Sequence, residues 1–265
     1  MNSFSSIDTL AFDLDGTLLN SRKELSNRNK EALLSCFHSG FHLFIATARP
    51  PRSVKQMLPE EILNCVTAIY YNGAFVENVD GATLSLTIPE TVSSVIVNTL
   101  CDCHERASIA IESEDVLYAL TDEAYANNKK HLSPPTLVSP DDMKMKPANK
   151  ILLFNLSSMA RRSVMHYADQ LNIVETDAGE LIQIMDGHVS KATTLSALCA
   201  KSSLSMAHMM AFGDDWNDLE MFQSCGYSVA MGNAVPELKR LADRTTQSND
   251  EDGVAHVLDQ ILAKG

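Results

Sequence analysis

A short apolar segment near the N-terminus runs directly into two aspartates. The segment Ile7–Phe12 holds no Pro or Gly, and Asp13, Leu14, Asp15 and Gly16 follow it. This pattern predicts a buried strand of a parallel sheet. Open α/β sheets bind ligands at the carboxyl ends of their strands. Residues two apart project to the same side of an extended chain, so we expect Asp13 and Asp15 to converge.

Two carboxylates on one spot repel each other unless a cation lies between them. Oxygen ligands favour a hard cation, and Mg²⁺ is the expected one. An acidic turn that merely ends a strand would use the same residue types, so the Asp-x-Asp-Gly pattern alone leaves both interpretations open.

Composition narrows the class of partner. The 265 residues allow one large domain or two modest ones. The formal net charge of −13 disfavours nucleic acid and anionic membrane surfaces as partners. A phosphorylated small molecule would need local positive charge from a metal, Lys or Arg. We find no signal-peptide pattern and no run of about 18 apolar residues, so we expect a cytoplasmic protein with its six cysteines reduced.

Strands and helices alternate in the first part of the chain. We expect a helix over 25–39, strands over 41–46 and 66–71, and a break at the Pro50-Pro51 pair. This rhythm predicts a parallel sheet with crossover helices. Strands and helices alternate again in the last part of the chain, with strands expected over 209–213 and 227–231 and helices over 236–242 and 252–263.

The middle of the chain has a different pattern. We expect strands over 83–88, 150–156 and 181–185 and a strand pair over 108–121. We also expect helices over 89–106 and 158–171, a short helix from 122, and a proline-rich loop between 134 and 147. The predicted organisation is a first core segment over 1–80, a separate α/β unit over 81–186 and a second core segment over 187–265.

Further polar clusters stand where strands or helices meet loops: Thr47 with Arg49, Lys191, and the run from Gly213 to Asp218. Each alone has an ordinary explanation as a strand end, a solvated lysine or a helix cap. In this order with Asp13 and Asp15, they resemble the four motifs of the haloacid dehalogenase (HAD) superfamily. The long insertion resembles the α/β cap of its Cof-type phosphatases (subfamily IIB). The resemblance implies a Rossmann-like parallel-sheet core with an inserted α/β cap domain.

The resemblance also implies a mechanism. Asp13 would be the nucleophile that forms an aspartyl phosphate. Asp15 would act as general acid and then as general base. For this role Asp15 must hold a proton when substrate arrives. We expect Asp13 and the phosphate to raise its pKa, while Mg²⁺ opposes the shift.

Metal and phosphate ligands follow from the same resemblance. Mg²⁺ would be held by the Asp13 carboxylate, the Asp15 carbonyl and the Asp214 carboxylate, with Asp218 as an outer partner that acts on these ligands or through water. The phosphate would be bound by the Thr47 hydroxyl, the backbone amides of Leu14 and Ala48, the Asn217 side chain and Lys191. Three residues depart from the usual pattern: Ala48 and Ala192 where glycine is common, and Asp215 where a smaller or neutral residue is common. Either alanine would be strained if its position required a positive φ.

The expected function is a Mg²⁺-dependent phosphatase for a small phosphorylated metabolite, such as a sugar phosphate, flavin mononucleotide or pyridoxal phosphate. Alternatives are a phosphosugar mutase and a non-catalytic sensor of a phosphorylated metabolite. Candidate contacts to the leaving group are Tyr118, Tyr125, Lys129 and His131, although a solvated helix face explains them equally well. The sequence predicts no particular oligomeric state.

Overall fold

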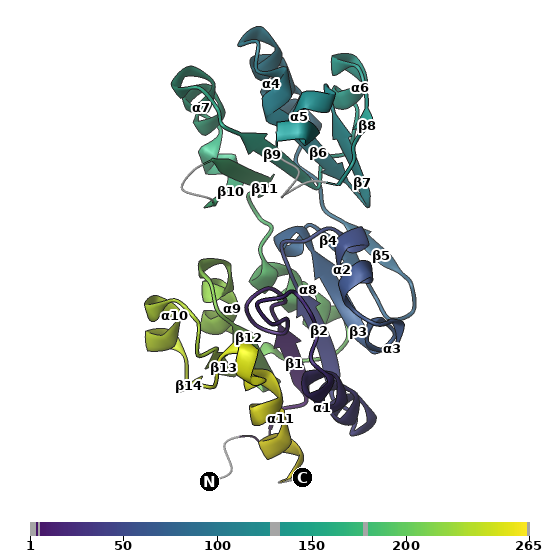
Figure 1. Ribbon diagram of the computed structural model, residues 1–265, viewed down its shortest axis with the longest axis vertical. Coiled ribbons are helices and arrows are strands. Elements are labelled where there is room, and N and C mark those ends of the chain that lie inside the picture. Colours follow the sequence, from purple (N-terminus) through teal and green to yellow (C-terminus); the bar gives the residue numbers. More distant parts are fainter. Residues whose placement is uncertain (1–3, 5, 128–132, 177–179, 264–265) are drawn as a thin grey trace. The chain divides into compact units, whose positions relative to one another are not determined.

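The computed structural model describes residue 4 and residues 6–127, 133–176 and 180–263. Contacts divide the chain into two units, each with its own sheet (Figure 1). The core unit comprises Met1–Leu84 and Ser190–Gly265, and the inserted unit comprises Ser85–Val189. The domain borders expected at 81 and 186 stay predictions.

The core unit is built on an eight-stranded sheet in the order β14-β13-β12-β1-β2-β3-β4-β5. Its strands are β1 (Thr9–Phe12), β2 (His42–Ala46), β3 (Val66–Tyr70), β4 (Phe75–Glu77), β5 (Thr83–Ser85), β12 (Met209–Gly213), β13 (Tyr227–Ala230) and β14 (Arg244–Thr245). The run from β14 to β3 is parallel, and β4 pairs antiparallel with β3. All four residues of β1 are buried, as expected for a central strand covered on both faces. The expected α/β core with a mainly parallel sheet is confirmed.

Strand register brings the functional loops to one edge of this sheet. Phe12 of β1 pairs with Ile45 of β2 and with Phe212 of β12. These three strands therefore end almost level, and the loops after them begin side by side. The residues that follow, Asp13, Thr47 and Asp214, leave the sheet at the same edge.

Helices cover both faces of the core sheet. They are α1 (Asn27–His38), α2 (Pro51–Met57), α3 (Glu60–Leu63), α8 (Lys191–Lys201), α9 (Leu219–Ser224), α10 (Pro236–Leu241) and α11 (Gly253–Leu262). The chain crosses from β1 through α1 to β2, and from β12 through α9 to β13 in the opposite direction. Because such crossovers are right-handed, α1 and α9 lie on opposite faces. Helix α11 packs on α1, and α8 packs on α9.

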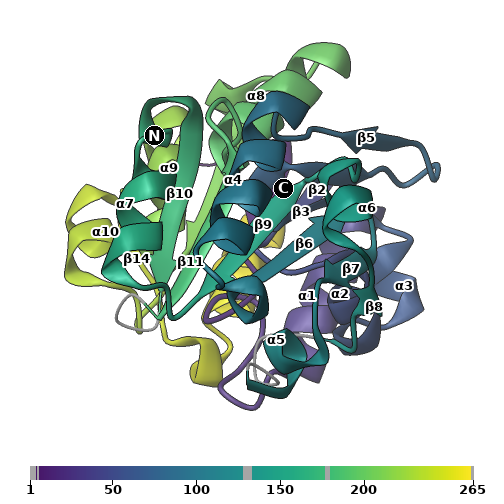
Figure 2. The same ribbon diagram turned by 90° about the horizontal axis from the view of Figure 1, so that it is seen from above.

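The inserted unit has a six-stranded sheet in the order β10-β11-β9-β6-β7-β8. Its strands are β6 (Ile109–Ser113), β7 (Val116–Ala119), β8 (Thr136–Leu137), β9 (Lys150–Phe154), β10 (Leu171–Thr176) and β11 (Leu181–Asp186). Figure 2 shows α4 (Glu90–Asp102) and α7 (Ser158–Met165) over the same face of this sheet. Residues of α4 and α7 share a buried cluster with Ile109 and Ile111, while the alternate residue Ala110 packs on the other face. This period of two fits a sheet covered on both sides.

Two expectations for the inserted unit were wrong. The helix expected to reach Leu171 ends at Met165, and Leu171 begins β10. The proline-rich loop contains the short helix α6 (Pro140–Lys144). Its start follows helix-capping rules, because Ser139 accepts a hydrogen bond from the Asp142 amide and proline occupies the first turn. The inserted unit also holds α5 (Asp122–Asn127). In the described part of the chain, no helix is both long and apolar enough to span a membrane.

Candidate active site

The loop after β1 places Asp13 and Asp15 at the carboxyl end of the sheet. Asp13 is 5% exposed, and its amide donates to the Phe212 carbonyl of β12 at 3.0 Å. Gly16 adopts φ +80°, and a Cβ at this position would overlap the Asp214 carboxylate. Glycine is therefore required here for two reasons: the backbone conformation and the close approach of Asp214.

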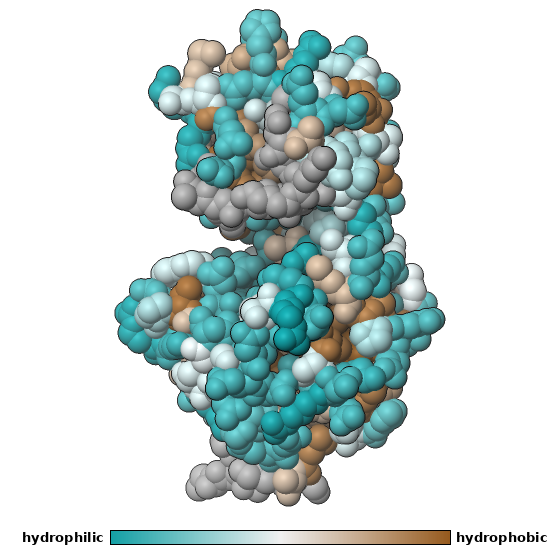
Figure 3. Space-filling view, in the orientation of Figure 1, coloured by the Kyte–Doolittle hydropathy of each residue, from teal (hydrophilic) through white to brown (hydrophobic). Residues whose placement is uncertain are grey.

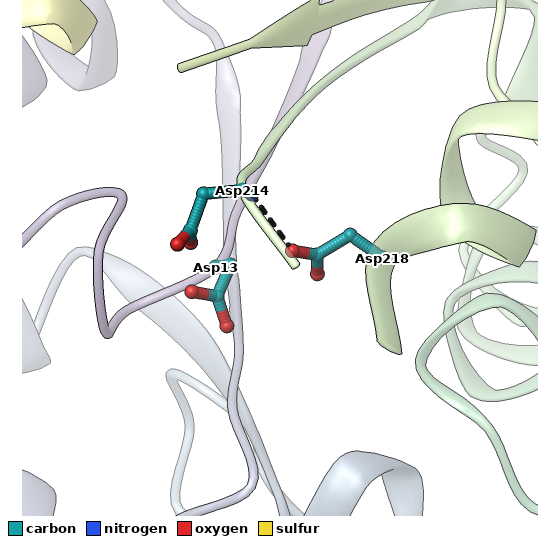
Figure 4. Close-up of side chains that lie close together, drawn as sticks. All are labelled: Asp13, Asp214 and Asp218. Atoms are coloured by element: carbon teal, nitrogen blue, oxygen red, sulfur yellow. Dashed lines mark hydrogen bonds between the residues drawn. The ribbon is translucent and has the colours of Figure 1, made fainter. Parts of the chain in front are cut away.

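Three carboxylates meet at this point. The side chains of Asp13, Asp214 and Asp218 lie together, with one oxygen from each within 4.8 Å of the others (Figure 4). Asp13 comes from the end of β1, Asp214 from the end of β12, and Asp218 from the short turn Trp216–Asp218. Such an all-oxygen set fits a hard divalent cation.

Neighbouring groups hold two of these carboxylates in place. Thr17 donates its hydroxyl hydrogen to Asp214 Oδ1 at 2.9 Å. Asp218 Oδ2 accepts the backbone amides of Asp214 and Asp215 at 3.0 and 3.2 Å. The other oxygen of Asp218 accepts from Lys191 at 2.7 Å. The Asp218 carboxylate thus accepts three hydrogen bonds within the protein. Among the described residues, the Asp214 carboxylate accepts only the one from Thr17 and a longer one of 3.4 Å from Asn233, so Asp13 and Asp214 are better placed to bind a metal directly.

Lys191 supplies a fixed positive charge beside the carboxylates. It is the first residue of α8, whose start is capped by Ser190 through the Thr193 amide. The side chain is 1% exposed, and its ammonium group pairs with Asp13 as well as Asp218. Burial by itself would lower the pKa of Lys191, but the charges of Asp13 and Asp218 outweigh it and raise the pKa above its usual value. Lys191 is therefore charged throughout the physiological pH range.

The acidic cluster remains short of positive charge despite Lys191. Burial raises the pKa of Asp13 well above its usual value; Lys191 counteracts this, and the charges of Asp218 and Asp214 add to it. Burial likewise raises the pKa of Asp214 to about 6, with a contribution from Asp218. A divalent cation would offset this repulsion, which is a second sign that the residues fit a metal ion.

Asp15 has a different environment from the expected one. Arg49 donates to both of its oxygens, with Nη2 to Oδ1 at 2.7 Å, and Lys23 Nζ lies 2.8 Å from Oδ1. Burial would raise the pKa of Asp15, but the hydrogen bonds and charges of Arg49 and Lys23 prevail and lower it. The pKa of Asp15 is thus lowered where a rise was expected, because Lys23 and Arg49 converge on this carboxylate and the sequence analysis placed neither of them there.

The predicted phosphate ligands lie around the same edge. Thr47 follows β2 directly, is 1% exposed, and accepts the Arg49 amide on its hydroxyl at 3.2 Å. Ala48 lies between Thr47 and Arg49 in this loop. The Leu14 side chain is fully buried, and its carbonyl accepts the Leu18 amide at 3.1 Å in the turn that follows Asp15.

A strained turn connects several of these elements. Tyr71, Asn72 and Gly73 follow β3 with φ of +53°, +57° and +122°. The Asn72 amide donates to the Thr47 carbonyl at 2.8 Å, and its side-chain oxygen accepts from Asn217 Nδ2 at 3.1 Å. Asn217, a predicted phosphate ligand, is thus oriented by a residue whose role the sequence analysis missed. An Asn-Gly pair is typical of a turn, but the residue that Asn72 contacts lies 145 positions away.

The cap residues suggested as leaving-group contacts are only partly described. Lys129 and His131 lie outside the described residues. Lys146 Nζ lies 4.7 Å from the centre of the Tyr118 ring, and Tyr125 packs against a buried cluster of the inserted unit. These contacts give both tyrosines structural roles within their unit.

Comparison with protein families matches residues 10–258 to the haloacid dehalogenase-like hydrolases. The chain belongs to this family. M6_Spy0533 of Streptococcus pyogenes serotype M6, whose name describes it as a candidate phosphatase, is 30% identical across 96% of this chain and 97% of its own. The 5-amino-6-(5-phospho-D-ribitylamino)uracil phosphatase YitU of Bacillus subtilis is 27% identical across 96% of this chain and 97% of its own. The X-ray structure of TM0651 from Thermotoga maritima has the same fold, with a TM-score of 0.83 at 24% identity over 96% of this chain and 97% of its own.

Family membership confirms the expected class of activity. This HAD-like hydrolase of the Cof type is a phosphatase, a phosphoric monoester hydrolase that acts on phosphorylated metabolites. Phosphatases of this family use a divalent metal ion, and the cluster of Asp13, Asp214 and Asp218 fits one.

The three departures from the HAD pattern are accommodated locally. Neither Ala48 nor Ala192 is among the described residues with a positive φ, so neither is strained. Ala192 lies inside α8, where alanine is a favourable residue. Asp215 caps the turn Trp216–Asp218 by accepting the Trp216 amide at 2.8 Å. The Asp215 carboxylate therefore stabilises the turn that positions Asn217 and Asp218.

Proposed function

We propose that the protein hydrolyses a small phosphate monoester with Mg²⁺ through an aspartyl phosphate on Asp13. The observation that carries the proposal is the meeting of Lys191 with Asp13, Asp214 and Asp218 at the carboxyl end of β1. A site that only bound phosphate would gain nothing from a buried carboxylate next to the reacting group, because two anions repel.

The first half-reaction forms a bond from an Asp13 oxygen to phosphorus and breaks the ester P–O bond. The leaving oxygen takes its proton from Asp15, which is bound by Arg49 and Lys23 before substrate arrives. An incoming phosphate dianion beside Asp15 favours the protonated carboxyl that this step needs. Lys191 faces Asp13 and neutralises charge on the transferring group.

The second half-reaction returns Asp13 to its starting state. Asp15 takes a proton from water, the water oxygen attacks phosphorus, the bond between the Asp13 oxygen and phosphorus breaks, and inorganic phosphate leaves. The Thr47 hydroxyl, the amides of Leu14 and Ala48, and the Asn217 side chain are the proposed phosphate ligands. Asp13, the Asp15 carbonyl and Asp214 would hold Mg²⁺, which would supply charge neutralisation. Asp218 orients Lys191 and would contact the metal through water.

We also propose residues 81–186 as a cap domain that selects the leaving group. The inserted unit has its own sheet and its own buried clusters, which supports independent folding. The candidate substrates are sugar phosphates and phosphorylated cofactors such as flavin mononucleotide or pyridoxal phosphate. YitU, by its name, acts on a phosphorylated ribityl compound, so that compound belongs in the test as well.

The test is release of inorganic phosphate from these compounds with Mg²⁺ and with EDTA. The Asp13→Asn variant should lose the activity, and the Asp102→Asn variant, which changes an exposed aspartate of α4, should keep it. Activity retained in Asp13→Asn would overturn the proposal. A phosphomutase would give an isomerised monophosphate in place of inorganic phosphate, and a sensor would bind without turnover.

A further inference from the structure

The loop between Asn20 and Glu24 presents a lysine to the catalytic carboxylate. Asn20 Oδ1 accepts the amides of Arg22 and Glu24 at 2.9 and 3.0 Å, and the Asn20 carbonyl accepts the Lys23 amide at 2.9 Å. Lys23 itself has φ +63°. Its side chain is 49% exposed, and the surface over the loop after β1 is strongly hydrophilic (Figure 3). The loop thus holds one face of the ammonium group against Asp15 and leaves the other accessible.

Two cations share a single carboxylate at this point. Lys23 and Arg49 both pair with Asp15, and neither forms another ion pair with the described residues. Lys23 uses one ammonium hydrogen for Asp15, and Arg49 uses its Nε and one Nη2 hydrogen. The pair therefore carries one surplus positive charge and several free donors. In a chain of net charge −13, such a local surplus favours an anionic ligand at this place.

The position of Asp15 fixes which part of a substrate would meet this charge. A general acid must lie within hydrogen-bond reach of the leaving oxygen, and Lys23 and Arg49 lie within hydrogen-bond reach of Asp15. A substrate group that contacts Lys23 or Arg49 therefore belongs to the leaving group and lies within a few bonds of the ester oxygen.

We infer that Lys23, with Arg49, forms a subsite for a compact anionic group close to the ester carbon of the substrate, either a carboxylate bonded to that carbon or a second phosphate on the neighbouring carbon. The inference rests on the proposed phosphatase function and narrows its substrate class. Lys23 acts as a specificity residue that distinguishes acidic from neutral leaving groups. Arg49, which grips Asp15 through two nitrogens, mainly orients the acid.

Three matched esters test the inference with the Mg²⁺-loaded enzyme. Glycerol 2-phosphate has a neutral leaving group, 2-phosphoglycerate has a carboxylate in place of one hydroxymethyl group, and glycerol 1,2-bisphosphate has a second phosphate. The readout is the ratio of kcat/KM for each acidic ester to that for glycerol 2-phosphate. Any effect of a substitution on Asp15 is shared by all three esters and cancels in the ratio.

The wild-type ratio should exceed about 10 for at least one acidic ester, as one charged hydrogen bond predicts. Lys23→Met should lower that ratio by about 10-fold or more, and Lys23→Arg should retain most of it. Arg22→Met removes the adjacent charge, which pairs with exposed Glu24, and should leave the ratio unchanged. If Lys23→Met lowers the ratio for 2-phosphoglycerate alone, the subsite binds a carboxylate. If it lowers the ratio for the bisphosphate alone, the subsite binds a second phosphate.

Other results overturn the inference. The inference fails if the wild-type enzyme shows no preference for either acidic ester, or if the enzyme hydrolyses other monoesters but none of these three. It also fails if Lys23→Met lowers kcat/KM equally for all three esters. In those cases the proposed phosphatase function still stands. Absence of metal-dependent hydrolysis of every monoester tested would instead refute the proposed function itself.

Discussion

Replacing Lys191 by methionine removes the one cation that lies among the buried carboxylates of the described active site. The ammonium group pairs with Asp13 and with Asp218, and all three side chains are almost fully buried. Methionine has a similar length and no charge, so Lys191→Met changes electrostatics more than packing. Asp218 keeps its two backbone amides, whereas Asp13 loses its cationic partner.

Loss of one partner of a buried ion pair costs about 3–5 kcal/mol of unfolding free energy, because it leaves an uncompensated buried charge. The pKa of Asp13, already raised by burial, should rise further. A carboxyl whose folded pKa exceeds its unfolded pKa destabilises the protein increasingly as pH rises between the two values. The deficit of Lys191→Met should therefore be smaller at about pH 5 than at about pH 7.5.

Urea unfolding of the metal-free protein at both pH values measures this deficit. Lys201→Met, at the exposed end of the same helix, serves as the control and should change the unfolding free energy by less than about 0.5 kcal/mol. In the assay for phosphate release, loss of the Lys191 charge should lower the rate about 100-fold. A Lys191→Met protein as stable as wild type at the higher pH, or with a deficit that grows on acidification, would refute this reasoning.

Three further predictions follow from the structure. Asn72→Gly keeps the positive φ but loses the contact to Asn217, so kcat/KM should fall about 10-fold while the free energy of unfolding changes little. An unchanged kcat/KM would contradict this prediction. Asn72→Ala should in addition lose about 1 kcal/mol of stability, measured by urea unfolding. Because burial raises the pKa of Asp214 to about 6, protons compete with the metal, and calorimetry should show Mg²⁺ affinity falling as pH drops below about 6; constant affinity down to about pH 5 would be contrary evidence. Burial raises the pKa of Cys36 to about 12, so native protein at about pH 8 should resist alkylation there by mass spectrometry, and rapid labelling would show the site to be open.

The main elements of the core could be predicted because their signals are local. The apolar segment before Asp13 forms β1, and the parallel register then brings Asp13, Thr47 and Asp214 to one edge. Periodicity misplaced the helix end near Leu171, because Val164, Ala168 and Leu171 have the spacing of one helix face, while Leu171 and Ile173 have the spacing of a strand. Nearby residues alone could not decide between them; pairing with β11 does.

The charge around Asp15 could not be predicted from the sequence. Lys23 reaches Asp15 only because the Asn20 side chain closes the loop and Lys23 takes a left-handed conformation. No glycine marks that conformation in the sequence. The support of Asn217 by Asn72 likewise depends on contacts between distant segments, which a single sequence does not display.

The most direct test of the account is chemical trapping of the phosphorylated residue. Enzyme with Mg²⁺ and a good substrate would be quenched during turnover and reduced with borohydride, which converts a phosphorylated aspartate to homoserine. Peptide mass spectrometry should then find homoserine at position 13, with none in the presence of EDTA or in the Asp13→Asn variant. Steady phosphate release with unmodified Asp13, or with the modification at another residue, would contradict the proposed mechanism.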